Sequence, residues 1–139
     1  MWKNIIFKKA FLALAITGIL NWVSYKLYLY WTVWWIDMVV HFFGGLTVGL
    51  TITWLMSLNR DFSMSKVSRI LTAVILGTIF VGVLWEIFEL YFQITSLADG
   101  INYWTDTTSD LIMDTLGGIF AWFYTTYLFK KLAVDKTKF

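Results

Sequence analysis

Four long apolar stretches dominate the pattern of hydrophobic and polar positions along the chain. They cover about residues 5–24, 36–58, 67–92 and 111–129. Each is long enough to cross roughly 30 Å of membrane hydrocarbon as an α-helix. The pattern therefore predicts an all-α fold, an integral membrane bundle of four transmembrane helices, formed by a single domain over residues 1–139.

The segments between these stretches differ in character. Residues 25–35 are rich in Tyr and Trp, which is typical of side chains at the lipid headgroups. Residues 59–66 are short and polar, so we expect the second and third spans to form an antiparallel hairpin. Asp99 and Gly100 give a turn signal before the fourth span, and residues 130–139 form a polar tail that we expect to fray.

Composition supports a membrane protein and excludes several kinds of site. Only 14% of the residues are charged, against about 25% in a soluble domain. The absence of cysteine excludes disulfides and thiolate zinc sites. There is no phosphate-binding glycine loop, no serine elbow and no basic nucleic-acid patch. Membrane lipids are the expected partners, nucleic acid is not, and the oligomeric state is left open.

The basic residues predict how the chain is oriented. Cytoplasmic loops of membrane proteins carry an excess of Lys and Arg. Only Lys26 lies between the first and second spans. The other ten lie before or within the first turns of the first span, around the second connection, or in the tail: Lys3, Lys8, Lys9, Arg60, Lys66, Arg69, Lys130, Lys131, Lys136 and Lys138. We therefore predict a multi-pass protein of the plasma (inner) membrane with both termini cytoplasmic.

Most acidic residues lie at the opposite, extracytoplasmic side. Residues three or four apart on a helix share a face. Two spans carry acids at such spacings, and the second span carries an acid four residues before the histidine. Carboxylates that face lipid are costly, so we expect these groups to face one another or a water-filled cleft. Together with the single histidine, they are Asp37, His41, Glu86, Glu89, Asp99, Asp106, Asp110 and Asp114.

Glycines follow the acidic groups by about one turn on the second and fourth spans. They are Gly44, Gly45, Gly117 and Gly118. Small residues let the backbones of membrane helices approach closely. We interpret these glycines as packing residues and not as ligand-binding ones.

Helix capping is the simplest alternative explanation for some of the acids. A carboxylate at a helix N-terminus accepts backbone hydrogen bonds and complements the helix dipole. This explanation weakens for Asp114, which lies about two turns deeper than the start of the last apolar stretch. It fails for Glu86 and Glu89, which lie near a helix C-terminus and need a cation or a proton. The acids that capping can explain are Asp37, Asp106 and Asp110.

A bound divalent metal is one way to balance these charges. Oxygen ligands with one imidazole suit Mg, Mn, Ca or Fe, with Zn less favoured. Shared protons or a charged His41 are the alternatives. Glu86 or Glu89 is the candidate general base on a metal-bound water, and Asp106 and Thr107 complete the polar site. The candidate metal ligands are Asp37, His41, Glu86, Asp110 and Asp114.

The order and spacing of three motifs resemble the VanZ-like group of small membrane proteins, most closely its YjdF-like relatives. The motifs are Asp37-x-x-x-His41, Glu86-x-x-Glu89 and Thr107-x-x-Asp110-x-x-x-Asp114-x-x-Gly117, within residues 36–122. The resemblance implies a polytopic membrane fold with a polar site at one face. The chain departs from the VanZ pattern at Met38, Glu89 and Asp114, which stand where Lys, Gln and Asn are usual, and it lacks the Arg that usually precedes the last motif. These departures make its site more acidic.

These observations favour a polar site that binds or acts on a lipid or a lipid-linked envelope precursor with the help of a divalent metal. Whether the chain is an enzyme stays open at this stage. A proton or cation transporter or channel is the first alternative, because ionisable residues inside membranes often form relays. A structural or partner-binding membrane protein, in which the acids only pack and cap, is the second.

Overall fold

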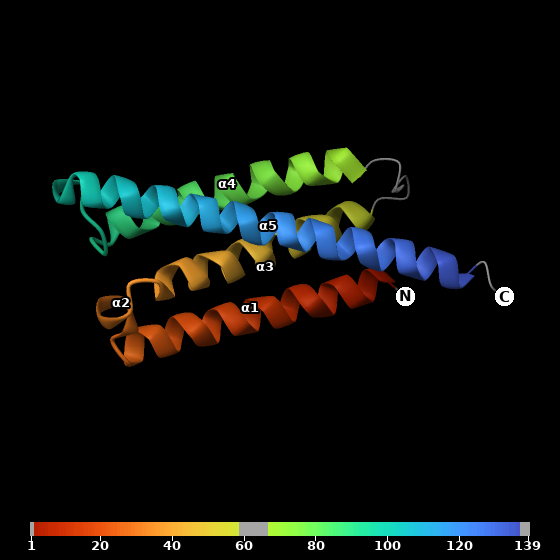
Figure 1. The fold of residues 1–139 in the computed structure, drawn as a ribbon, viewed down its shortest axis with the longest axis horizontal. Helices are drawn as coiled ribbons and strands as arrows, with labels where there is room; N and C mark the ends of the chain where they lie inside the picture. The colour runs from red at the N-terminus through yellow and green to blue at the C-terminus, as the bar shows by residue number, and fades with distance from the viewer. Residues whose placement is uncertain (1, 59–66, 137–139) are drawn as a thin grey trace.

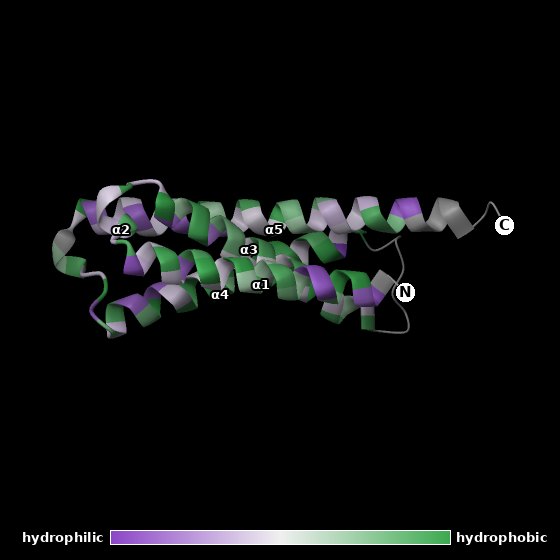
Figure 2. Cartoon of the chain, turned by 90° about the horizontal axis from the view of Figure 1, so that it is seen from below, coloured by the Kyte–Doolittle hydropathy of each residue, from purple (hydrophilic) through white to green (hydrophobic). Residues whose placement is uncertain are grey.

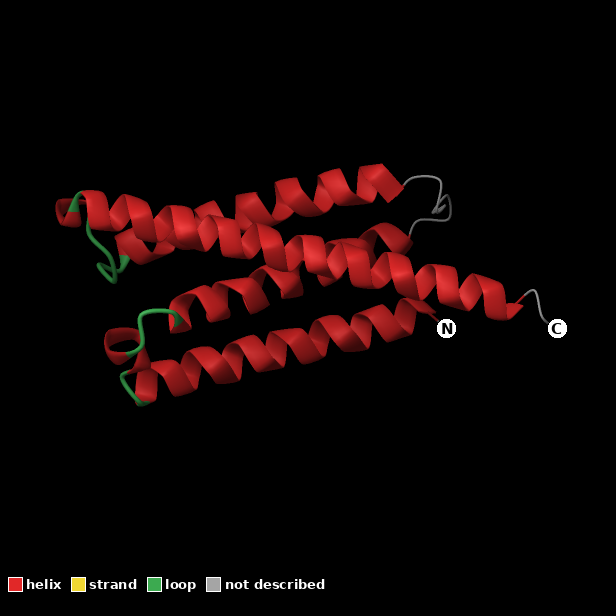
Figure 3. Cartoon of the chain, in the orientation of Figure 1, coloured by secondary structure: helices red, strands yellow, loops and turns green. Residues whose placement is uncertain are grey.

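The computed structural model describes residues 2–58 and 67–136, and the regular elements in this part of the chain are all helical (Figures 1 and 3). The all-α prediction is therefore confirmed. The helices are α1 (Trp2–Lys26), α2 (Leu29–Thr32), α3 (Ile36–Leu58), α4 (Val67–Tyr91), the 3₁₀-helix η2 (Leu97–Asp99) and α5 (Ile101–Lys136).

The four long helices run side by side with alternating direction, and α3 contacts each of the other three (Figure 1). The start of α1, the end of α5 and the ends of α3 and α4 that flank residues 59–66 lie at one end of the bundle. The short helices α2 and η2 lie at the other, together with the starts of α3 and α5. We call this second end the site end, because the acidic residues predicted to converge belong to it.

Three described helices are long and apolar enough to cross a membrane: Lys3–Lys26, Ile36–Leu58 and Val67–Tyr91. Hydrophilic residues gather towards the two ends of the bundle, with mostly hydrophobic residues between them (Figure 2). Helix α5 contains the fourth predicted span but is more polar and does not meet the same measure. Its 36 residues extend over about 54 Å, longer than the hydrocarbon layer.

Close packing of α3 on α5 depends on glycine. A Cβ atom at Gly45 would collide with the backbone of Asp114, and one at Gly117 would collide with the backbone of Phe42. Any other residue at either position would push the two helices apart. The packing prediction is therefore confirmed for Gly45 and Gly117, and for Gly118, where a Cβ atom would lie 2.5 Å from a methyl carbon of Thr78. At Gly44 a Cβ atom would make only an ordinary contact, 3.6 Å from Asp114 Oδ1.

Helix α5 begins earlier than the sequence suggested. Gly100 has a φ of 62°, a positive value that glycine adopts readily, and α5 starts at the next residue. Asp106 and Asp110 therefore lie inside the helix, so the prediction that they could cap its N-terminus is wrong. Asp37 does lie in the first turn of α3, where a carboxylate complements the helix dipole.

Two connecting segments also differ from expectation. The aromatic segment 25–35 contains the one-turn helix α2, which no periodic pattern indicated. The tail expected to fray from residue 130 continues as helix through Lys136, since its Lys, Leu and Ala residues favour helix. The polar connection 59–66 and residues 137–139 lie outside the described residues.

Candidate functional site

His41 lies at the centre of the acidic residues of the site end and is only 6% exposed. Its Nε2 atom lies 3.7 Å from Asp37 Oδ1 and 3.9 Å from Asp110 Oδ2. Its Nδ1 atom lies 3.3 Å from Asp114 Oδ2. The two ring nitrogens therefore face different carboxylates: Nε2 faces Asp37 and Asp110, and Nδ1 faces Asp114.

Helical spacing explains why these four groups meet. Asp37 and His41 are four residues apart on α3, and Asp110 and Asp114 are four residues apart on α5, so each pair lies on one face of its helix. The close approach at Gly45 turns those faces towards each other. Asp110 and Asp114 are buried, whereas Asp37 keeps about a third of its side chain exposed.

Glu86 brings α4 into the site and has an unpartnered oxygen. Its side chain is buried, and its Oε2 atom accepts a hydrogen bond of 2.6 Å from the Thr107 hydroxyl of α5. Its Oε1 atom is buried without a hydrogen-bond partner. The Glu86 carboxylate is also near enough to interact electrostatically with Asp37 and Asp110. A buried acceptor without a partner is costly, so this oxygen is available for a proton, a cation or a ligand.

Gly82 makes room for Asp114 beside α4. A Cβ atom at Gly82 would lie 2.6 Å from Asp114 Oδ2 and 2.8 Å from a methyl carbon of Leu111. Only the absence of a side chain at this position lets the Asp114 carboxylate lie between α3 and α4 and reach His41. This packing role of Gly82 was not recognised in the sequence, although a glycine one turn before Glu86 was a visible signal.

Two predicted site residues lie outside the cluster around His41. Asp106 is exposed. Glu89 is only partly buried, and its Oε1 atom accepts a hydrogen bond of 2.9 Å from the indole of Trp85. The structure therefore brings together Asp37, His41, Glu86, Thr107, Asp110 and Asp114, and leaves Glu89 and Asp106 at the edge.

Tyr30 and Asn21 border the site, although sequence reasoning did not select either. The Tyr30 hydroxyl of α2 donates a 2.8 Å hydrogen bond to Asn21 Oδ1 of α1. Burial raises the pKa of the Tyr30 phenol above its usual value, and the nearby carboxylates of Asp37, Glu89 and Asp110 raise it further. The phenol therefore stays neutral beside the acids. The only sequence signal for Tyr30 was its place in an aromatic segment that precedes the acidic start of α3.

The charges of the cluster do not balance with protein groups alone. In the described part of the chain, the ion pairs of its carboxylates all go to His41. One imidazole can carry at most one positive charge against Asp37, Asp110 and Asp114, and isolated charges in a low-dielectric interior are costly. The remaining negative charge has to be met by protons or by a bound cation.

Three of these residues form a group that could hold a metal ion. Asp37, His41 and Asp110 each offer one ligand atom, and these atoms lie within 4.8 Å of one another. Metal-binding histidines usually donate their second ring N–H to a carboxylate, which fixes the ring. Asp114 lies at Nδ1, which is where that second partner is needed if Nε2 is the ligand atom.

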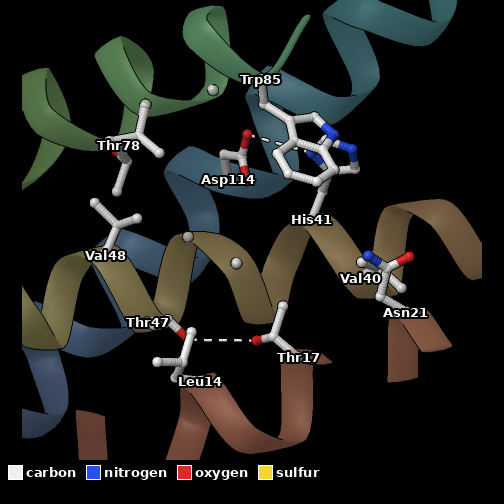
Figure 4. A pocket seen from close by; sticks show the side chains of 14 residues that line it. Leu14, Thr17, Asn21, Val40, His41, Thr47, Val48, Thr78, Trp85 and Asp114 are labelled. Carbon is white, nitrogen blue, oxygen red and sulfur yellow. Dashed lines mark hydrogen bonds and ion pairs between the residues drawn. The ribbon is translucent and has the colours of Figure 1, made fainter. Parts of the chain in front are cut away.

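A cavity of about 260 Å³ begins at His41 and Asp114 (Figure 4). It extends towards the middle of the bundle between α1 and α4, over the surface of α3. Its lining includes Gly44, Gly45 and Gly82. The cavity is thus continuous with the buried side of the cluster.

The family model described as a predicted membrane protein, DUF2238, matches residues 2–131, so the chain belongs to this family. Membership agrees with the three apolar helices and supports a protein embedded in the membrane. Comparisons with curated proteins and with solved structures give no match.

Proposed function

We propose that this member of the DUF2238 family binds a divalent cation at its site end and presents it to the headgroup of a lipid or a lipid-linked envelope precursor. The observation that carries this proposal is the division of carboxylates between the two nitrogens of His41. Nε2 faces Asp37 and Asp110, whereas Nδ1 faces Asp114. A structural histidine needs one partner, but this one has acids on both sides of a buried ring.

Each residue has a distinct role under this proposal. Asp37, His41 through Nε2, and Asp110 hold the ion, which is a mixed nitrogen and oxygen set suited to Mn or Fe and, with more oxygen ligands, Mg or Ca. Zn is less favoured because structural and catalytic zinc sites usually contain more nitrogen or sulfur. Asp114 orients the imidazole, so we assign it as a positioning residue and not as a metal ligand.

Glu86 is the favoured general base. A bound divalent ion polarises a phosphate or carbonyl oxygen and lowers the pKa of a bound water. Glu86 has one oxygen held by Thr107 and one without a partner, so it is fixed in place and still free to accept a proton. Glu89 is less suited because its Oε1 atom is already bound by Trp85 at the edge of the site.

We further propose that α5 crosses the membrane as a fourth span and that both termini are cytoplasmic. The distribution of Lys and Arg supports this orientation, and the length of α5 allows its polar ends to extend beyond the hydrocarbon. Because the chain has no cysteine, single cysteines report each side cleanly. An impermeant maleimide should label Asn102→Cys in intact cells but Lys131→Cys only after permeabilisation; the reverse result would overturn the orientation.

Metal analysis of the purified protein tests the site itself. Wild type should retain a divalent ion near one per chain after loading with Mn²⁺ and desalting. Asp110→Asn should lose it, because Asp110 lies beside Nε2. Asp106→Asn is the matched control, since it removes an exposed carboxylate one turn away on the same helix. No ion in wild type, or equal retention in the two variants, would refute the proposal.

The transport alternative gains no specific support. A relay below the site would pass through hydroxyl groups of α3, such as Thr51 and Thr53. Both donate hydrogen bonds to backbone carbonyls of their own helix, 2.8 Å and 2.9 Å long. These hydroxyl groups are therefore already hydrogen-bonded within α3, and nothing in their geometry indicates a relay. A purely structural role for the acids is the second alternative, and a wild type that binds no ion would favour it.

A further inference from the structure

We infer that the cavity beside His41 binds one hydrocarbon chain of a lipid, which enters sideways from the bilayer between α1 and α4. The headgroup of that lipid then lies at the site end. The placement of the headgroup rests on the proposed cation site. The placement of the hydrocarbon chain rests only on the shape and lining of the cavity.

The cavity runs from polar groups towards the middle of the membrane. His41 and Asp114 form its polar end, and Leu14 of α1, Val48 of α3 and Val81 of α4 line the rest. Seven residues of α3 separate His41 from Val48, which corresponds to about 10 Å along the helix. An elongated space of about 260 Å³ with one polar end matches a lipid chain attached to a headgroup.

The inner walls offer almost no polar group to a ligand. Three threonines line this part, and each hydroxyl donates a hydrogen bond to a backbone carbonyl of its own helix. These bonds run from Thr17 to Ala13, from Thr47 to Phe43 and from Thr78 to Val74, at 2.9, 2.9 and 3.0 Å. Because the hydroxyls are satisfied internally, the walls favour a hydrocarbon occupant over a polar solute.

The cavity is open on the side that faces lipid. Leu14, Val81 and Trp85 line it and are 56%, 42% and 40% exposed. All three lie in helices that are long and apolar enough to cross the membrane. Figure 1 shows α1 and α4 on opposite sides of α3, and the cavity lies between residues of these three helices. In a bilayer, the molecules that meet such an opening are lipids.

Asn21 provides a hydrogen-bond donor at the outer end of the cavity. The Tyr30 hydroxyl donates to Asn21 Oδ1, which leaves the Asn21 amide N–H groups to donate elsewhere. In Figure 4 the nitrogen of this amide lies on the His41 side of the side chain. A headgroup oxygen between Asn21 and the cation site would be bound from both sides. Without the cation, the carboxylates would repel a phosphate, whereas a bound cation would attract one. We therefore propose that the occupant is a lipid with an anionic, oxygen-bearing headgroup.

Photocrosslinking tests where the chain lies. The probe is phosphatidylglycerol with a diazirine midway along one acyl chain, added to the full chain in nanodiscs with Mn²⁺. Val81→Trp fills the cavity wall, and Val83→Trp is the matched control, since Val83 is 41% exposed on the same helix but does not line the cavity. We expect label on peptides carrying Leu14, Val48 or Val81. Val81→Trp should reduce the labelling of these peptides about tenfold, which corresponds to a loss of about 1.4 kcal/mol in binding free energy. Val83→Trp should leave the labelling unchanged.

Uniform labelling of the outer helix faces, or no effect of Val81→Trp, would overturn the inference. Leu14→Trp on the opposite wall serves in the same test if Val81→Trp does not fold. Mn²⁺ content measured in the same samples separates this inference from the proposed function. If wild type binds no Mn²⁺ but is labelled at the residues that line the cavity, the hydrocarbon-chain site is supported and the cation site is refuted. If wild type binds Mn²⁺ but the label does not concentrate at the cavity, the cation site is supported and the hydrocarbon-chain site is refuted.

Discussion

His41 of α3 and Asp114 of α5 meet across the interface of the two helices, with Nδ1 3.3 Å from Asp114 Oδ2. This contact lies on the side of the imidazole away from Asp37 and Asp110. If Nδ1–H donates to Asp114, Nε2 carries the lone pair that a cation held by Asp37 and Asp110 would need. The relationship therefore distinguishes the acids that would hold a cation from the acid that would orient the histidine.

Replacement of Asp114 should weaken cation binding less than replacement of Asp110. Asp114→Asn removes the partner that orients His41, and such outer partners typically contribute about 10–100-fold in metal affinity. Asp110→Asn removes a ligand and should cost more. Equilibrium dialysis of both variants with Mn²⁺ gives the order directly. A larger loss for Asp114→Asn would show that the roles of the two acids are reversed.

A side chain at Gly82 should disturb the site from α4. In Gly82→Ala the new Cβ atom would meet Asp114 Oδ2 at 2.6 Å, so the carboxylate or the helix has to move. We expect a loss of about 1–3 kcal/mol in unfolding free energy, measured by denaturation in detergent, together with weaker Mn²⁺ binding. Gly18→Ala is the control, because a Cβ atom there has no neighbour within 4 Å. Equal stability of the two variants would contradict the packing described for Asp114.

The hydrogen bond from Thr107 to Glu86 should contribute to stability. Thr107→Val leaves both oxygens of the buried Glu86 carboxylate without a protein partner, which costs about 1–3 kcal/mol. Thr108→Val is the neighbouring control, since the exposed Thr108 hydroxyl bonds only to the carbonyl of Trp104 in its own helix. Denaturation of both variants in detergent compares them. If Thr107→Val is no less stable than Thr108→Val, Glu86 is not held as the structure indicates.

Tyr30 should titrate at higher pH than an ordinary tyrosine, because burial and the nearby carboxylates raise its pKa. A raised pKa in the folded state means that the neutral phenol stabilises the fold. That contribution is complete below the usual tyrosine pKa of about 10 and is lost as the pH rises through the raised value. The difference in tyrosinate absorbance between wild type and Tyr30→Phe isolates this group. A difference spectrum that develops near pH 10 would contradict the placement of Tyr30 beside the acids.

Much of the site followed from local spacing, because an α-helix fixes which residues share a face. The pairs Asp37 with His41 and Asp110 with Asp114 were visible as residues four apart, and the glycine at 45 indicated close packing. The cost of a carboxylate in lipid then implied that the faces meet. These inferences need only the helical period and the class of solvent.

Features that depend on where a helix starts or on contacts between helices did not follow. Gly100, with its positive φ, precedes the start of α5, and without that boundary Asp106 and Asp110 resembled caps. Tyr30 and Asn21 are nine residues apart on different helices, so no periodic pattern links them. The contact of Asp114 with Nδ1, opposite the acids at Nε2, depends on how α3 and α5 are rotated against each other. The sequence does not encode that rotation as a local spacing.

The central claim is that the Nε2 atom of His41 binds a divalent cation together with Asp37 and Asp110. Pulsed electron paramagnetic resonance of the Mn²⁺-loaded protein tests it most directly, because a coordinated imidazole nitrogen modulates the spin echo. We predict nitrogen modulation in wild type and in the Asp106→Asn control, and its loss in His41→Gln. Bound Mn²⁺ without nitrogen modulation in wild type, or no bound Mn²⁺ at all, would contradict the claim.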